Sequence, residues 1–149
     1  MRSMDPEHSG DSTAVPLSHR DYALLLELRT GLRQFERWSA DRAVAFGLTP
    51  SQHQLMLAIR GHDQESGPTI REAAEYLLIK HHSAVELVDR CVRAGLVERS
   101  RDEVDHRVVR LHLTAEGAHV LAELSSAHLE ELTRMRPLFE SMLGKLAER

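Results

Sequence analysis

The feature that most constrains the fold is a change in the spacing of apolar residues about two thirds of the way along the chain. Before it, apolar residues recur every three or four positions, the pattern of amphipathic helices. In "RVVRLHL", Val109, Leu111 and Leu113 alternate with polar side chains, which indicates a half-buried strand. The short stretch "LVERS" precedes it, and the charged "RDEVDH" joins the two. A lone hairpin is only marginally stable, so we expect this one to pack against helices.

Capping residues and helical spacing place helices on both sides of this hairpin. Ser18 can cap the first helix and Gly47 can end it, while Thr49 and Pro50 suit the start of the second. The predicted helices cover residues 19–46, a stretch from Pro50, residues 69–77, 81–94 and 115–135, and a last helix that begins at Pro137.

These elements predict a mainly α (α+β) fold with one domain over residues 18–149. Helices followed by a hairpin over about 49–113 are typical of a winged helix-turn-helix with a two-stranded β-wing. The flanking helices, about 18–46 and 115–148, are more apolar than a lone three-helix domain needs. Residues 1–17 are polar, rich in Pro, Gly and Ser, and aperiodic, so we expect a disordered tail.

Composition restricts the class of protein. No apolar run approaches the roughly 18 residues of a membrane span, and no secretory signal pattern is present. The single cysteine, Cys91, precludes an internal disulfide and fits a cytoplasmic location. The net charge of −4 argues mildly against a broad basic nucleic-acid surface, so any such surface must be local. We expect no enzyme, because no nucleophile triad, phosphate-binding glycine loop or paired carboxylates stand out.

The hairpin carries a motif that points to a family. Its loop contains Asp-x-Arg and its second strand leads into Leu-Thr-x-x-Gly, in "GLVERSRDEVDHRVVRLHLTAEG". This pattern resembles the wing of the MarR family of bacterial transcriptional regulators. The preceding "AVELVDRCVRAGLVER" resembles that family's recognition helix, and "LTPSQHQLMLAI" resembles its second helix. The resemblance covers roughly residues 20–147.

The resemblance implies a DNA-binding transcriptional regulator, most simply a repressor released by a small-molecule effector. It also implies a homodimer in which the terminal helices, about 18–46 and 115–148, interlock. Two winged domains would then grip a pseudo-palindromic operator in double-stranded DNA.

The wing supplies the first candidate DNA contacts. Arg107 is the cation best placed to enter the minor groove, where a narrow groove concentrates negative potential. By resemblance, Asp105 supports the wing by pairing with an arginine. The alternative is that Asp105 and Arg107 form a solvated surface pair worth little. Arg101 and His106 flank the tip and could contact phosphates.

The start of the helix over 81–94 should face the major groove, whose base edges carry a distinct hydrogen-bonding code. Arg90 lies further along and could contact phosphate or pair with Glu86 four residues earlier. The residues that we expect to bind DNA from the helices are Thr69, Lys80, His81, His82, Ser83 and Arg90.

A metal- or redox-sensing regulator on the same fold is the alternative. Adjacent helical histidines point about 100° apart, so His81 and His82 cannot easily share one ion. His82 and Glu86 could supply two ligands, but a third would have to come from a distant histidine. We therefore expect neither a metal ion nor another cofactor. Cys91 lies on an apolar helix face, which favours a small buried hydrophobe over a redox sensor.

The effector site is the least determined part. By resemblance, small aromatic or anionic compounds would bind a cleft between the first, second and fifth helices. The candidate residues there are Tyr22, Trp38, His53 and Met56. A core role competes for two of them, because His53 could be a satisfied core histidine and Trp38 could simply be buried.

Overall fold

The computed structural model describes residues 15–148. Most of the predicted tail, residues 1–14, therefore lies outside the described part of the chain. The elements in chain order are α1 (His19–Ala45), α2 (Pro50–Arg60), α3 (Ile70–Leu77), α4 (His81–Arg93), β1 (Val97–Arg101), β2 (Val109–Leu113) and α5 (Ala115–Ala147). The predicted fold class is confirmed: the protein is mainly helical, with one antiparallel hairpin between α4 and α5.

Hydroxyl side chains begin four of the five helices. Ser18, Thr49, Thr69 and Thr114 each accept the backbone N–H three residues ahead, which satisfies one of the donors left free at a helix start. In α1, α2 and α3 the residue three positions on bonds back to the cap and completes a capping box. The start of α4 differs, because Lys80 makes no side-chain cap.

The turn of the helix-turn-helix is built by an unusual residue. Leu78 ends α3 in the left-handed conformation, with φ of 53°, although its side chain gains no burial and is 91% exposed. A β-carbon makes this conformation costly, by roughly 1–2 kcal/mol. The N–H groups of Leu78 and Ile79 bond to the carbonyls of Glu75 and Ala74, so the turn is held by the end of α3.

The hairpin is anchored at its base. Val97 pairs with Leu113 and Arg101 with Val109, and beyond the last pair Asp102 N–H bonds to the Val108 carbonyl. Leu111 is fully buried, and its N–H donates to the carbonyl of Pro68 in the loop between α2 and α3. The strand β2 is therefore held by the helical layer, as the marginal stability of a lone hairpin requires.

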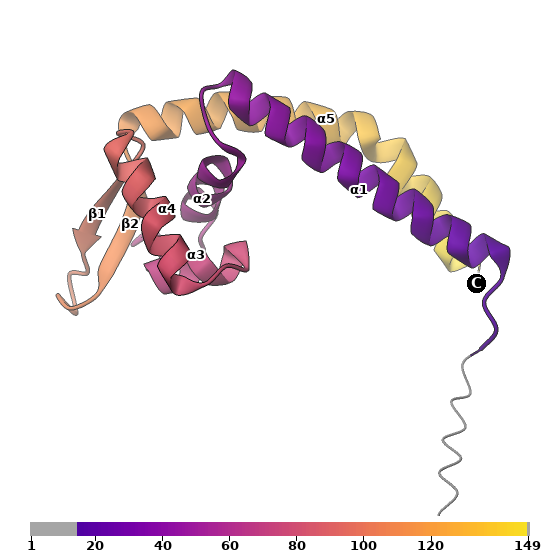
Figure 1. Ribbon diagram of the computed structural model, residues 1–149, viewed down its shortest axis with the longest axis horizontal. Helices are drawn as coiled ribbons and strands as arrows, with labels where there is room; N and C mark the ends of the chain where they lie inside the picture. Colours follow the sequence, from indigo (N-terminus) through magenta and orange to yellow (C-terminus); the bar gives the residue numbers. More distant parts are fainter. Residues whose placement is uncertain (1–14, 149) are drawn as a thin grey trace, which may run out of the picture.

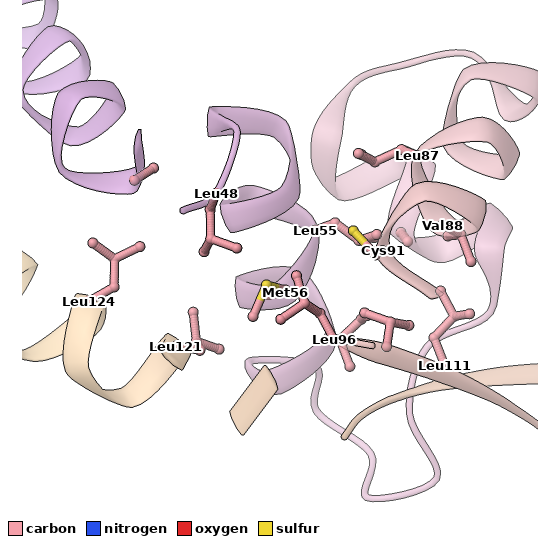
Figure 2. Packing of buried hydrophobic residues seen from close by; sticks show 14 residues of the cluster. Leu48, Leu55, Met56, Leu87, Val88, Cys91, Leu96, Leu111, Leu121 and Leu124 are labelled. Atoms are coloured by element: carbon pink, nitrogen blue, oxygen red, sulfur yellow. The ribbon is translucent and has the colours of Figure 1, made fainter. Parts of the chain in front are cut away.

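One hydrophobic core joins α2, α3, α4, the hairpin and the first part of α5. Figure 2 shows Leu55 and Met56 of α2 between Cys91 and Val88 of α4 on one side and Leu121 and Leu124 of α5 on the other. The largest fully buried side chains are Leu55, Met56, Leu111, Leu124, Val88, Val97, Pro68 and Cys91.

The part of α1 before Ala43 and the part of α5 after Leu124 contribute no residue to this core. They form a two-helix arm that extends away from it (Figure 1). Lys145 donates to Glu27 at 2.7 Å, and Arg20 pairs with Glu148 near the far end. Gly31 is buried against Leu138, at a spacing that leaves little room for a β-carbon. The helices thus run antiparallel and in contact along the arm.

The predicted break before Pro137 is wrong, because α5 continues through it. Proline removes one intrahelical hydrogen bond and normally bends or ends a helix. Here the residues on both sides of Pro137 pack along α1, and this tertiary contact outweighs the local preference. Within residues 15–148, no helix combines the length and the apolar character that crossing a lipid bilayer demands.

Candidate nucleic-acid interface and ligand groove

The start of α4 and the tip of the hairpin lie at the same end of the winged domain, away from α5 (Figure 1). The opposite end is fixed by Thr114, whose hydroxyl donates to the Gly95 carbonyl at 2.6 Å. Gly117 in the first turn of α5 packs directly on the Leu96 backbone. Because α4 ends and β1 begins there, the start of α4 and the loop 102–108 must project from the far side.

The polar residues at the start of α4 are presented to solvent. Lys80, His81 and His82 are exposed, and Ser83 is half-buried. Their backbone also lacks a side-chain cap, which leaves N–H groups free for an anionic partner. Among residues 15–148 no ion pair joins Arg90 to Glu86, and both side chains are exposed. Thr69 is different, because its hydroxyl is engaged in capping α3.

The wing tip places Arg107 in solvent. Its side chain is 91% exposed, with Nε 3.0 Å from Asp105 Oδ1 and a second bond to Asp105 Oδ2 at 3.1 Å. Asp105 Oδ1 also accepts the Arg107 backbone N–H. These side-chain and backbone bonds from Arg107 lower the pKa of Asp105, and the same carboxylate raises the pKa of Arg107. Nearby, the exposed Arg101 donates to the carbonyl of His106, another exposed residue.

A second aspartate supports the wing, and sequence reasoning missed it. Asp102 accepts the backbone N–H groups of Val104 and Asp105, and its Oδ2 lies 2.9 Å from Arg110 Nε. The N–H of Asp105, then that of Val104 and the Arg110 side chain lower the pKa of Asp102 to about 2. The sequence signal was an aspartate at the start of a tight loop, where such side chains commonly bond the backbone two residues on.

Arg110 joins this wing to the rest of the domain. Its side chain is 18% exposed and also donates to the carbonyl of Gly67, at 3.3 Å. Gly67 has a φ of 78°, and a β-carbon there would lie 2.2 Å from the Leu111 carbonyl oxygen. Only glycine allows the loop between α2 and α3 to approach the strand β2 so closely.

Sequence comparisons match this part of the chain. Residues 46–108 match the model of the MarR family. YsmB of Bacillus subtilis, described as an uncharacterized HTH-type transcriptional regulator, is 37% identical over 73 residues, or 49% of this chain and 48% of YsmB. The LexA repressor of Magnetococcus marinus is 36% identical over 70 residues, 46% of this chain and 30% of that protein. The chain thus aligns with about half or less of these curated relatives.

Solved structures extend the likeness over most of the chain. A MarR family protein from Bacillus stearothermophilus has a TM-score of 0.71 at 24% identity, covering 89% of this chain and 97% of that one. The predicted resemblance to the MarR family is thereby confirmed. The fold is also shared with wild-type MarR from E. coli in its apo form, with a TM-score of 0.62 at 21% identity and coverages of 89% and 98%.

A groove of about 820 Å³ separates the winged domain from the arm. It is lined mainly by apolar groups of α1, α2 and α5, together with His53, His128 and Ser39. Sequence reasoning missed His128 and Ser39, since nothing in the spacing of the helices shows which faces meet across 89 residues.

The histidines of the groove form a defined pair. His128 Nδ1 lies 2.8 Å from the Leu124 carbonyl, which can only accept, so this nitrogen carries a proton. In the neutral ring Nε2 therefore accepts from the Ser39 hydroxyl, at 2.6 Å. The His53 ring lies 4.7 Å from that of His128, between centroids, and is buried. Burial, followed by the repulsion from His128, lowers the pKa of His53.

Two of the four residues predicted for the effector site lie elsewhere. Met56 is fully buried in the winged core and does not line the groove. Tyr22 is 59% exposed and lies more than three turns of α1 before Phe35, about 20 Å at the rise of an α-helix. Trp38 packs against the His128 ring, with centroids 4.9 Å apart, and so lies next to the groove.

The arrangement of potential metal ligands and the environment of Cys91 bear on the alternatives of metal sensing and redox sensing. Within residues 15–148, no three histidine, cysteine or acidic side chains are grouped as a metal site requires. Cys91 is fully buried, and burial raises the pKa of its thiol to about 11. A thiol with this pKa holds little of the reactive thiolate at neutral pH.

Proposed function

We propose that this protein is a sequence-specific DNA-binding transcriptional regulator, a homodimeric repressor that a small-molecule effector releases from a pseudo-palindromic operator. The observation that carries the proposal is the shared orientation of the α4 start and the wing tip. The exposed His81, His82 and Lys80 would enter the major groove while Arg107 enters the minor groove. A MepR mutant from S. aureus, bound to an oligodeoxyribonucleotide, has this fold with a TM-score of 0.63 at 20% identity, covering 84% of this chain and 97% of that one.

DNA binding can be tested by footprinting the purified protein on the DNA upstream of its own gene. We expect protection of two half-sites about one helical turn apart. Affinity should fall steeply with salt, because cationic side chains displace counterions from the phosphates. Protection of a single half-site would contradict the dimer, and absence of any protection at low salt there and across a genomic fragment pool would contradict the function.

Arg107→Ala tests the wing. We expect it to weaken operator binding by about 1–3 kcal/mol, roughly five- to 150-fold, as the loss of one good groove contact. Arg136→Ala is the matched control, because Arg136 also pairs with a carboxylate, Glu140, and is 74% exposed, but lies on the arm. Equal affinities of the two variants in a fluorescence-anisotropy titration would remove Arg107 from the interface.

Asp105→Asn tests whether Asp105 positions Arg107 for DNA binding or only forms a surface ion pair with it. Asp105 holds both the backbone and the guanidinium of Arg107, so we expect the substitution to weaken operator binding while the winged core stays folded. If Asp105 only neutralises Arg107, its removal would strengthen binding instead.

The arm supports the homodimer. Two helices alone cannot bury all their apolar residues on each other. Apart from Leu129 and Leu132, which line the groove, the exposed apolar side chains of the arm are Tyr22, Leu25, Leu26, Leu32, Leu143 and Leu146. A second copy of the chain would cover these exposed apolar side chains. In sedimentation velocity we expect a dimer, and Leu26→Glu should dissociate it. Val104→Glu in the wing, at an even more exposed apolar residue, should leave it intact.

The groove is the proposed effector site. Its apolar lining suits an aromatic ring, and the two imidazoles with Ser39 suit an acidic group. Trp38 is the only tryptophan and contacts the His128 ring, so its fluorescence should report benzoate as a probe ligand. His53→Leu should abolish the fluorescence change on adding benzoate. His119→Leu, at an exposed side chain of α5, should leave that change intact. A response that survives His53→Leu would place the ligand elsewhere.

A further inference from the structure

His62, in the loop after α2, is a buried histidine with one nitrogen unused. Its side chain is only 8% exposed. Nδ1 lies 2.9 Å from the Tyr76 hydroxyl, whereas the buried Nε2 has no hydrogen-bond partner among residues 15–148. Nε2 lies 3.8 Å from Glu72 Oε2, too far for a hydrogen bond of ordinary length. Buried polar atoms without partners are uncommon, and each asks for an explanation.

Glu72 connects this histidine to the wing. Its Oε2 accepts the Thr69 N–H at 2.8 Å as part of the α3 capping box and lies 3.6 Å from Arg110 Nη1. Arg110 in turn bonds to Asp102 at the wing base and to the Gly67 carbonyl. A continuous series of contacts therefore runs from the His62 ring through the start of α3 to the hairpin.

The charges along this series are unbalanced when His62 is neutral. Two carboxylates, Glu72 and Asp102, share the single cation Arg110. The bond from the Thr69 backbone is the largest influence that lowers the pKa of Glu72, and Asp102 titrates near 2, so both stay ionised at neutral pH. The groups that face His62 are Glu72 and the Tyr76 hydroxyl on α3, with Arg110 of β2 behind Glu72. A proton on His62 would supply a second positive charge beside the two carboxylates.

We propose that His62 is a proton-responsive positioning residue for the wing. When protonated, its Nε2–H donates to Glu72, and the resulting ion pair fixes the loop 61–68, the start of α3 and, through Arg110, the hairpin as one unit. The wing is then held in its DNA-binding position, so operator affinity rises as acid protonates His62. The DNA part of this inference rests on the proposed function, while the link between His62 and Arg110 does not.

The link is tested without DNA by following the Arg110 Nε–H signal of the full-length protein by NMR at pH 7.5 and 6.0. In the wild type we expect it to shift together with the His62 ring signals. In Glu72→Gln that shift should disappear, although glutamine still completes the α3 capping box and keeps the helix start intact. Glu123→Gln, which removes the exposed partner of His119 on α5, is the matched control and should leave the shift unchanged. An Arg110 signal that still shifts in Glu72→Gln would overturn the link.

The consequence for DNA is tested by operator affinity at the same two pH values. Exposed histidines at the interface can contribute their own pH dependence, so the ratio of affinities is compared between variants. The operator affinity at pH 6.0 divided by that at pH 7.5 gives one ratio for each variant. We expect this ratio to be at least about threefold lower in His62→Gln than in wild type. His119→Gln should keep the wild-type ratio. An unchanged ratio in His62→Gln overturns the positioning role. If the wild type binds no DNA at either pH, the proposed function fails, and the NMR comparison still decides the link.

Discussion

The winged domain and the α1–α5 arm use apolar residues in opposite ways. In the winged domain, Leu55, Met56 and Leu111 are fully buried within a single chain. On the arm, Leu26 and Leu143 are 64% and 66% exposed, although both lie on helices in mutual contact. The difference teaches that the winged domain can close its own core, whereas the arm is apolar beyond what its own two helices can bury.

The largest expected contrast comes from truncating one leucine in each region. Leu55→Ala should destabilise the fold by about 2–5 kcal/mol, because it leaves a cavity in a fully buried site. Leu26→Ala should change stability by less than about 0.5 kcal/mol at protein concentrations where the chain is monomeric. Urea unfolding followed by circular dichroism measures both.

Repeating that comparison at high protein concentration sharpens it. If a second copy covers the arm, Leu26→Ala becomes more costly as concentration rises, while the cost of Leu55→Ala stays constant. Equal costs for the two variants at low concentration would contradict the contrast between the regions.

Two glycines should give effects of opposite sign. A β-carbon at Gly117 would lie 2.1 Å from the Leu96 carbonyl oxygen, so Gly117→Ala should destabilise the winged domain by about 1–3 kcal/mol. At Gly144 on the arm, no atom of residues 15–148 outside the adjoining residues and the backbone of its own helix lies within 4 Å of that position, so Gly144→Ala should stabilise α5 by about 0.5–1 kcal/mol. Thermal unfolding of the two variants measures both signs, and a destabilising Gly144→Ala would show that this face of the arm is covered.

Lowering the pH should reduce the stability of the fold through protonation of Asp102 in the wing. The backbone N–H groups of Asp105 and Val104 and the Arg110 side chain lower its pKa from 3.8 to about 2. A carboxyl group with a lowered pKa contributes stability that is complete above the ordinary pKa and is lost as pH falls from about 4 to about 2. Asp102→Asn should therefore flatten the acid limb of the stability curve.

On the arm, the pair of Arg136 and Glu140 serves as the electrostatic control, since both side chains are more than half exposed. Glu140→Gln should change stability by less than about 0.5 kcal/mol. A wild-type acid limb in Asp102→Asn would show that the wing pair adds nothing to the fold.

The reactivity of Cys91 towards a thiol reagent contrasts the buried core with the exposed arm. Burial raises the pKa of Cys91 to about 11, so at pH 8 the folded protein should react with a thiol reagent at least about tenfold more slowly than the unfolded chain. A cysteine introduced at the exposed arm position Ser126 provides the matched comparison and should react rapidly in the folded protein. Rapid reaction of Cys91 in the folded protein would revive the redox alternative.

Local signals in the sequence predicted the fold well. Ser18, Thr49 and Thr69 begin helices where their hydroxyls can cap them, and the alternation around Leu111 marks β2. The continuous α5 was missed, because a proline rule based on neighbouring residues does not include packing along α1. Likewise Tyr22 and Met56 were predicted for the effector cleft because they are polar-tipped or soft residues on the helices that the resemblance places around it. The rotation and length of each helix put their side chains outside the groove.

The sequence by itself determined the order of helices and hairpin, the exposed histidines at the start of α4 and the motif of the wing, because hydrophobic period, capping and turn chemistry are local. Only the tertiary structure decided which side chains meet across long separations: His53 with His128, His62 with Glu72, and Arg110 with both Asp102 and Gly67. These contacts depend on how helices pack around one core, and helical spacing specifies a buried face without specifying its partner.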